Sequence, residues 1–74
     1  DRTAEALWAN RKAIELASGK NKNRVQASSH YNIARIYEAE GHWQDALTHF
    51  QTALSLKQHS AYTKGIKRMQ EKLK

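Results

Sequence analysis

The chain contains no cysteine and no proline, and its three glycines are Gly19, Gly41 and Gly65. Without cysteine, neither a disulfide nor a thiolate metal site can stabilise the fold. Because proline and glycine both interrupt helices, their scarcity favours an all-α chain. No apolar run approaches the ~18 residues of a membrane-spanning helix, and no signal peptide is visible.

Motifs of catalysis are also missing. The sequence has no glycine-rich phosphate loop, no cysteine nucleophile and no paired-carboxylate motif. We therefore predict that the protein is not an enzyme and uses no cofactor.

One group of residues resembles a metal site. On a helix, His42, Asp45 and His49 would share a face, and two histidines with a carboxylate can hold a divalent ion. The distance from the first to the last is about 10 Å at ~1.5 Å per residue, which is long for one ion. We interpret these residues as surface polarity and predict no metal site. We expect His30 and His59 to have no partners that suggest chemistry.

The net charge is +6 over 74 residues, enough for one small domain, and it is unevenly distributed. In residues 57–74, six Lys or Arg side chains against one Glu give +5. This excess fits an acidic protein partner or nucleic acid. Nucleic acid is the less favoured partner, because no aromatic residues interleave with the basic ones. We predict a secondary basic surface on the last helix, formed by Lys64, Lys67, Arg68 and Lys72.

Apolar spacing predicts four helices, over residues 3–17, 24–40, 43–57 and 60–73. The stretch SGKNKN at 18–23 separates the first two helices, and Gly41 fits the left-handed residue that ends the second. The last helix has a single apolar stripe with a charged back, which is typical of a solvent-facing terminal helix. The stripe consists of Tyr62, Ile66, Met69 and Leu73.

One helix type occurs twice. EALWANRKAIEL at 5–16 aligns without gaps on DALTHFQTALSL at 45–56, an offset of 40 residues. The alignment places Ala6 on Ala46 and Ala13 on Ala53. Because a different helix lies between the copies, the arrangement predicts stacked helical hairpins.

Residues 27–60 resemble one tetratricopeptide repeat, a helix–turn–helix of 34 residues. The positions that carry the resemblance, and that we expect to pack the repeat, are Ile33, Ala34, Tyr37, Gly41, Trp43, Ala46, Phe50 and Ala53. In this family the two alanines of the second helix are close-contact points, and the aromatic between them fills the space between hairpins. The resemblance implies an all-α fold in which antiparallel helical hairpins form a short right-handed superhelical stack of four helices.

The sequence also departs from the family pattern. His30 replaces an aromatic early in the first helix, Gln58 replaces a late proline, and Asn10 replaces the plugging aromatic in the upstream copy. The offset of 40 is similar to the longer-spaced variants of the family. The microtubule-interacting and trafficking module, a three-helix domain of similar length, is an alternative that the 40-residue self-match disfavours.

The resemblance sets the expected domain organisation. Residues 1–74 are expected to form a single domain: 3–17 the second helix of a partial upstream repeat, 24–57 one complete repeat, and 60–73 a C-terminal capping helix. Because the chain starts at Asp1, we expect a C-terminal fragment of a longer protein of this family. No compartment signal is present, and the cytoplasm is the default expectation.

The expected function is protein–protein interaction, as a scaffold or adaptor that binds a peptide or helix of a partner protein in a concave groove. The family's groove positions correspond to Ser28, Tyr31, Asn32, Arg35 and Glu38. The alternatives are a basic nucleic-acid-binding domain and a purely structural or oligomerising segment. Trp8 aligns with Thr48, an outward position, so the N-terminal edge is a candidate for self-association.

Overall fold

The computed structural model describes all residues from 1 to 74 and contains four α-helices. They are α1 (Arg2–Leu16), α2 (Lys22–Ala39), α3 (Trp43–Leu56) and α4 (Ser60–Lys72), and a 3₁₀ turn, η1 (Gly19–Asn21), precedes α2. Each helix begins and ends within two residues of its predicted bounds. The largest shift is at the start of α2, because η1 completes the chain reversal sooner than the predicted loop.

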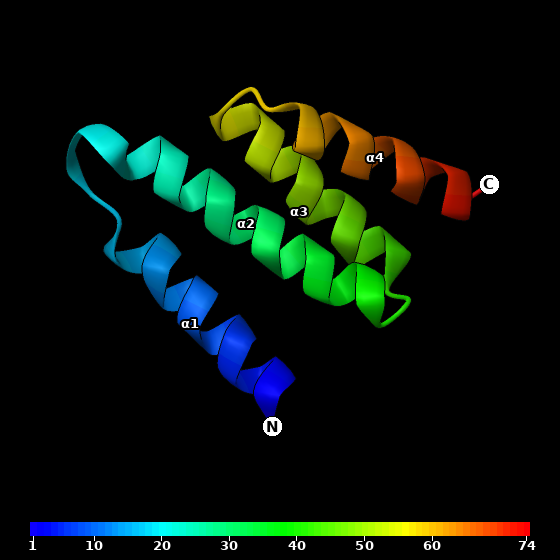
Figure 1. Cartoon of the computed structure of the whole chain (residues 1–74), viewed down its shortest axis with the longest axis horizontal. Coiled ribbons are helices and arrows are strands. Elements are labelled where there is room, and N and C mark those ends of the chain that lie inside the picture. Colours follow the sequence, from blue (N-terminus) through cyan, green and yellow to red (C-terminus); the bar gives the residue numbers. More distant parts are fainter.

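The four helices alternate in direction and lie in chain order across a thin body (Figure 1), with principal extents of 39, 31 and 13 Å. α2 packs between α1 and α3, and α4 packs along α3. This arrangement confirms the predicted all-α stack of antiparallel hairpins. None of the helices is long and apolar enough to cross a membrane.

Gly41 makes the tight turn between α2 and α3. Its φ of 77° is left-handed, a conformation that a side chain would strain. The Gly41 N–H donates to the Glu38 carbonyl at 3.1 Å, and the His42 N–H donates to the Tyr37 carbonyl at 2.9 Å. This pair of hydrogen bonds is the Schellman motif, which satisfies the last carbonyls of a helix and turns the chain back sharply.

The core lies where α2, α3 and α4 meet. The side chains of Ala27 and Ala34 on α2 and of Ala46 and Ala53 on α3 are fully buried. Because alanine is short, the two helices can approach closely at both levels. The buried side chains form two clusters, one at each of these two levels. One cluster contains Ala34, Ala46, Leu47, Phe50 and Met69, and the other contains Ala27, Ala53 and Tyr62.

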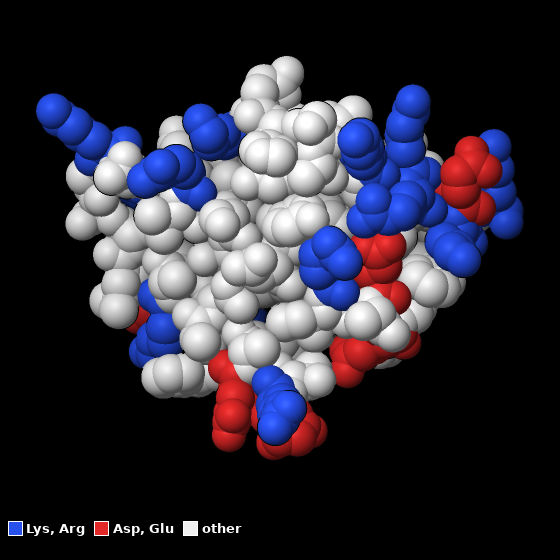
Figure 2. Space-filling view, viewed as in Figure 1, with Lys and Arg blue, Asp and Glu red and all other residues white.

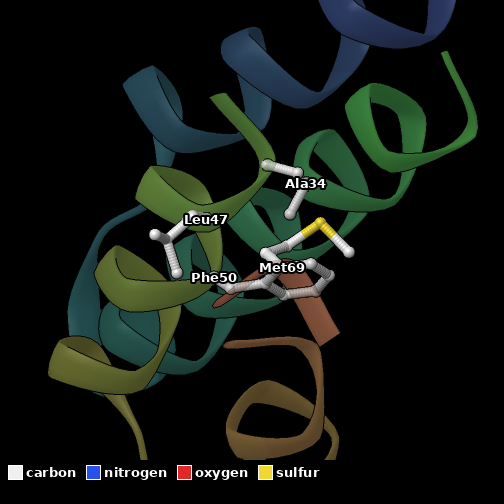
Figure 3. Close-up of a cluster of buried hydrophobic side chains, with 5 residues drawn as sticks. Ala34, Leu47, Phe50 and Met69 are labelled. Carbon is white, nitrogen blue, oxygen red and sulfur yellow. The ribbon is translucent and has the colours of Figure 1, made fainter. Parts of the chain in front are cut away.

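Phe50 fills the space between the hairpin and α4. Its ring is fully buried in one cluster with Ala34, Leu47 and Met69, and Figure 3 shows it lying against Met69. Of the other residues expected to pack the repeat, Ile33 is also buried, whereas Tyr37 and Trp43 are half-buried.

The buried stripe of α4 differs from the predicted one. It runs through Tyr62, Gly65 and Met69, whereas Leu73 is 42% exposed at the C-cap of the helix. A Cβ atom at Gly65 would lie 2.5 Å from the Phe50 ring. The backbone of α4 therefore rests directly on this ring, a contact that only glycine permits.

α1 is held less firmly than the other helices, because none of its residues is buried. Part of its junction with α2 is polar: Asn32 Nδ2 donates to Asn10 Oδ1 at 3.1 Å, and Gln26 Nε2 donates to the Ile14 carbonyl at 2.9 Å. On its outer side, Trp8 is 63% exposed and Leu16 is 74% exposed.

We predict that Gly65→Ala destabilises the fold. The added methyl group must push the Phe50 ring out of its site, and overpacking of this kind costs about 1–3 kcal/mol. The better helix propensity of alanine offsets up to about 1 kcal/mol of this loss. Urea unfolding should therefore give a lower free energy of unfolding than that of the wild type. Adding Phe50→Leu should recover part of the loss; an unchanged or higher stability for Gly65→Ala alone would show that the contact is not tight.

We also predict that α1 opens before the rest of the chain. Since it buries no residue, its amides should exchange with deuterium while those of α2 and α3 remain protected. Hydrogen-exchange mass spectrometry measures this order directly. Equal protection in α1 and α3 would contradict the interpretation of a loosely held helix.

Candidate functional site

α2 has one strip that its neighbours leave uncovered, and the five predicted groove residues lie on or beside it. Ser28, Asn32 and Arg35 are exposed, whereas Tyr31 and Glu38 are half-buried. These positions share a helix face because they are spaced by three, four or seven residues. The structure contains no enclosed pocket, so the strip is an open face.

Tyr31 belongs as much to the core as to the surface. Its ring centre lies 5.8 Å from that of Phe50 and 5.4 Å from that of Tyr62. Its hydroxyl accepts a hydrogen bond from Arg35 Nη1 at 2.9 Å. The core therefore fixes the ring, and the ring positions the Arg35 guanidinium on the strip.

Glu38 joins α2 to α4. Arg68 donates to both of its carboxylate oxygens, from Nε at 2.8 Å and from Nη2 at 2.9 Å. Arg35 Nε lies 3.6 Å from the same carboxylate. The hydrogen bond from Arg68 holds the pKa of Glu38 below its ordinary value, against the opposing effect of burial. A bidentate pair of this kind sets the relative orientation of the two side chains and also adds to the strength of their interaction.

The predicted basic surface adjoins the α2 strip, because its Arg68 pairs with Glu38 of the strip. Lys64, Arg68 and Lys72 follow one another at intervals of four along α4 and therefore share one face. Figure 2 shows Lys and Arg side chains gathered over α4 at the upper right, with acidic side chains beside them. Lys72 Nζ lies 5.2 Å above the centre of the Trp43 ring, and Lys67 is exposed.

Asn32 lies on the opposite border of the strip, where its amide donates to Asn10 of α1. The five predicted residues thus divide into three groups: Glu38 and Tyr31 toward α4, Asn32 toward α1, and Ser28 with Arg35 on the open face between them.

The sequence interpretation missed a pair of histidines. His30 and His49 face each other across α2 and α3 with their Nδ1 atoms 2.9 Å apart, so the expectation that His30 has no partner of interest was wrong. His49 also packs against the Tyr37 ring, with ring centres 5.7 Å apart. No group of three or more His, Cys, Asp or Glu residues is arranged to hold a metal ion.

The fold and the open strip define a small helical-repeat module. The family profile of the tetratricopeptide repeat matches residues 27–60. The predicted repeat is therefore confirmed over the same residues, 27–60. Searches of curated proteins and of solved structures gave no match. Tetratricopeptide repeats generally mediate protein–protein interactions and are generally not enzymes.

We predict a pH-dependent effect of Glu38→Gln. The folded-state pKa of Glu38 lies below its ordinary value of 4.5, so the ion pair stabilises the fold above that pH. This stabilisation is lost as the pH falls through the folded-state pKa. Near neutral pH the variant should lose about 0.5–1 kcal/mol of unfolding free energy, and in strongly acidic solution it should match the wild type.

Urea unfolding at both pH values measures this difference. Glu71→Gln is the matched control, because Glu71 pairs with Lys74 within one exposed turn and its removal should have little effect. An equal loss for both variants, or a loss at Glu38 that persists in acid, would contradict the prediction.

Proposed function

We propose that this chain is a protein–protein interaction module that binds a peptide or helix of a partner protein along the α2 strip and the adjoining face of α4. The family supports the general role, and the open face of α2 supports the location. Ser28 and Arg35 lie at the centre of the strip and are exposed, so a partner reaches them without displacing another element.

Charge supports an acidic partner. Arg35 and Arg68 share the single carboxylate of Glu38, so this cluster keeps one positive charge in excess. Lys64 and Lys72 extend the positive charge along the same face of α4. A partner carboxylate near Arg35 would find a guanidinium that Tyr31 already orients, which lowers the entropic cost of binding. The excess charge next to an exposed, oriented guanidinium is the observation that carries this proposal.

A second candidate is self-association through α1. Trp8 and Leu16 both expose most of their surface on the outer side of this helix. Exposed apolar side chains of this size favour an interface. Sedimentation over a range of concentrations tests this alternative, and a strict monomer at high concentration would exclude it.

The main proposal predicts that acidic peptides bind and that Arg35→Glu weakens them. An array of peptides graded in net charge selects the ligand, and NMR chemical-shift mapping locates its site. We expect shifts on α2 and α4, and about tenfold weaker binding for Arg35→Glu, because a charge-assisted hydrogen bond is replaced by repulsion.

The matched control is Gln51→Glu, which adds a negative charge at an exposed position of α3 and should leave affinity nearly unchanged. Shifts confined to α1 and α3, or equal effects of the two variants, would place the site elsewhere.

A further inference from the structure

The His30–His49 contact is a hydrogen bond between the two rings. Their centres are 5.2 Å apart and their planes are inclined by 26°. This separation equals the 2.9 Å between the Nδ1 atoms plus about one ring radius on each side, so both nitrogens lie near the line that joins the centres. The lone pair of one nitrogen therefore points at the hydrogen of the other.

This geometry limits how many protons the pair can hold. In the neutral pair, one Nδ1 carries a hydrogen and donates, while the other Nδ1 accepts and its ring is protonated at Nε2. A first added proton goes to the free Nε2 of the donor ring and leaves the bond intact. A second must go to the accepting Nδ1, because no other nitrogen remains. Two N–H groups and two positive charges would then face each other, and the rings would have to separate.

The surroundings of the pair oppose positive charge. From α1, the positive charge of Arg11 disfavours a positive charge on His49. Arg11 Nη2 also donates a hydrogen bond to the Tyr37 hydroxyl at 3.2 Å. On α2, the Tyr37 ring packs against His49, and the His42 ring, which directly precedes α3, packs nearly perpendicular to Tyr37. Asp45 on α3 is the one acidic group that favours the charged form of His49.

Burial lowers the pKa of His30. Burial, His30 and Arg11 together lower the pKa of His49, and Asp45 opposes them. The resulting pH dependence has a definite sign. The unfolded chain binds protons more readily than the folded chain, so stability is highest above the ordinary histidine pKa of 6.5 and falls as the pH drops through the lower folded-state values. The effect of Glu38 begins at lower pH, below 4.5.

We propose that His30 and His49 form a proton-operated catch between the two helices of the repeat, closed by a shared hydrogen and opened when both rings become charged. The catch belongs to the hairpin itself and does not depend on any partner bound to the α2 strip. It makes the α2–α3 hairpin sensitive to mild acid, the range in which histidine changes charge.

Thermal unfolding at about pH 7.5 and about pH 5.5, with EDTA present to exclude metal bridging of the two rings, tests the catch. The wild type should lose at least ~4 °C of Tm on acidification. The double variant His30→Gln with His49→Gln can still hydrogen-bond across the helices but cannot titrate, and it should lose much less. His42→Gln is the matched control: His42 is exposed and outside the pair, so this variant should keep the full drop. Equal drops in the wild type and the double variant would overturn the proposal.

A second measurement needs no variant. NMR of the imidazole nitrogens in the wild type should show His30 and His49 titrating in a coupled manner and below the ordinary histidine pKa of 6.5. Near neutral pH, one Nδ1 should be protonated and the other bare. Independent titration of the two rings near the ordinary histidine value would overturn the catch, even if the double variant failed to fold.

Discussion

The fold depends on one contact, the buried ring of Phe50 against the backbone of α4 at Gly65. Two features allow it. Ala34 and Ala46 are small enough for α2 and α3 to close on each other around the ring, and Gly65 has no side chain to hold α4 away. The charged surface depends on the same contact. Because α4 lies so close, Arg68 sits 5.8 Å above the ring and reaches Glu38 on α2. An apolar contact thus determines where the ion pair forms, and not the reverse, since an ion pair at the surface contributes little by itself.

The upstream junction uses different chemistry. Asn10 aligns with Phe50 in the repeated helix, and at this position α1 meets α2 through the Asn10–Asn32 hydrogen bond instead of a buried ring. A hydrogen bond within the protein replaces hydrogen bonds to water, so its net contribution to stability is small. Burial of an aromatic ring, in contrast, removes a large apolar area from water. The helical stack is therefore held firmly on the α4 side of the hairpin and weakly on the α1 side. Stability in such a stack is a sum of neighbour contacts, so the difference remains local to α1.

Much of this architecture could be predicted from the sequence. Helix bounds and the Gly41 turn follow from apolar spacing and turn chemistry, which are local. The pairing of residues across the α2–α3 hairpin is also nearly determined. The residue numbers of facing partners add to about 80, as for Ala27 with Ala53 and Ala34 with Ala46. For His30 and His49 the sum is 79. Applying this register would have revealed the histidine pair. The Glu38–Arg68 pair could not be found in this way, because it joins the α2–α3 hairpin to α4, and its register depends on how closely α4 approaches Phe50. The role of Gly65 could not be predicted for a similar reason. A glycine within a helix is explained only by the side chain that packs against it, here Phe50.

α2 takes part in both pH-sensitive interactions, an ion pair with α4 and a histidine pair with α3. Toward α4 it is held by Glu38, which must be ionised; toward α3 it is held by His30, which must share one hydrogen with His49. Acid weakens both bonds, but in sequence, since a histidine titrates well above a carboxylate. Falling pH should therefore act first on the hairpin that forms the repeat and afterwards on the junction that attaches α4. The open strip lies between Glu38, which α4 holds, and Asn32, which binds Asn10 of α1, so the geometry that orients Arg35 persists only while α2 keeps these neighbours.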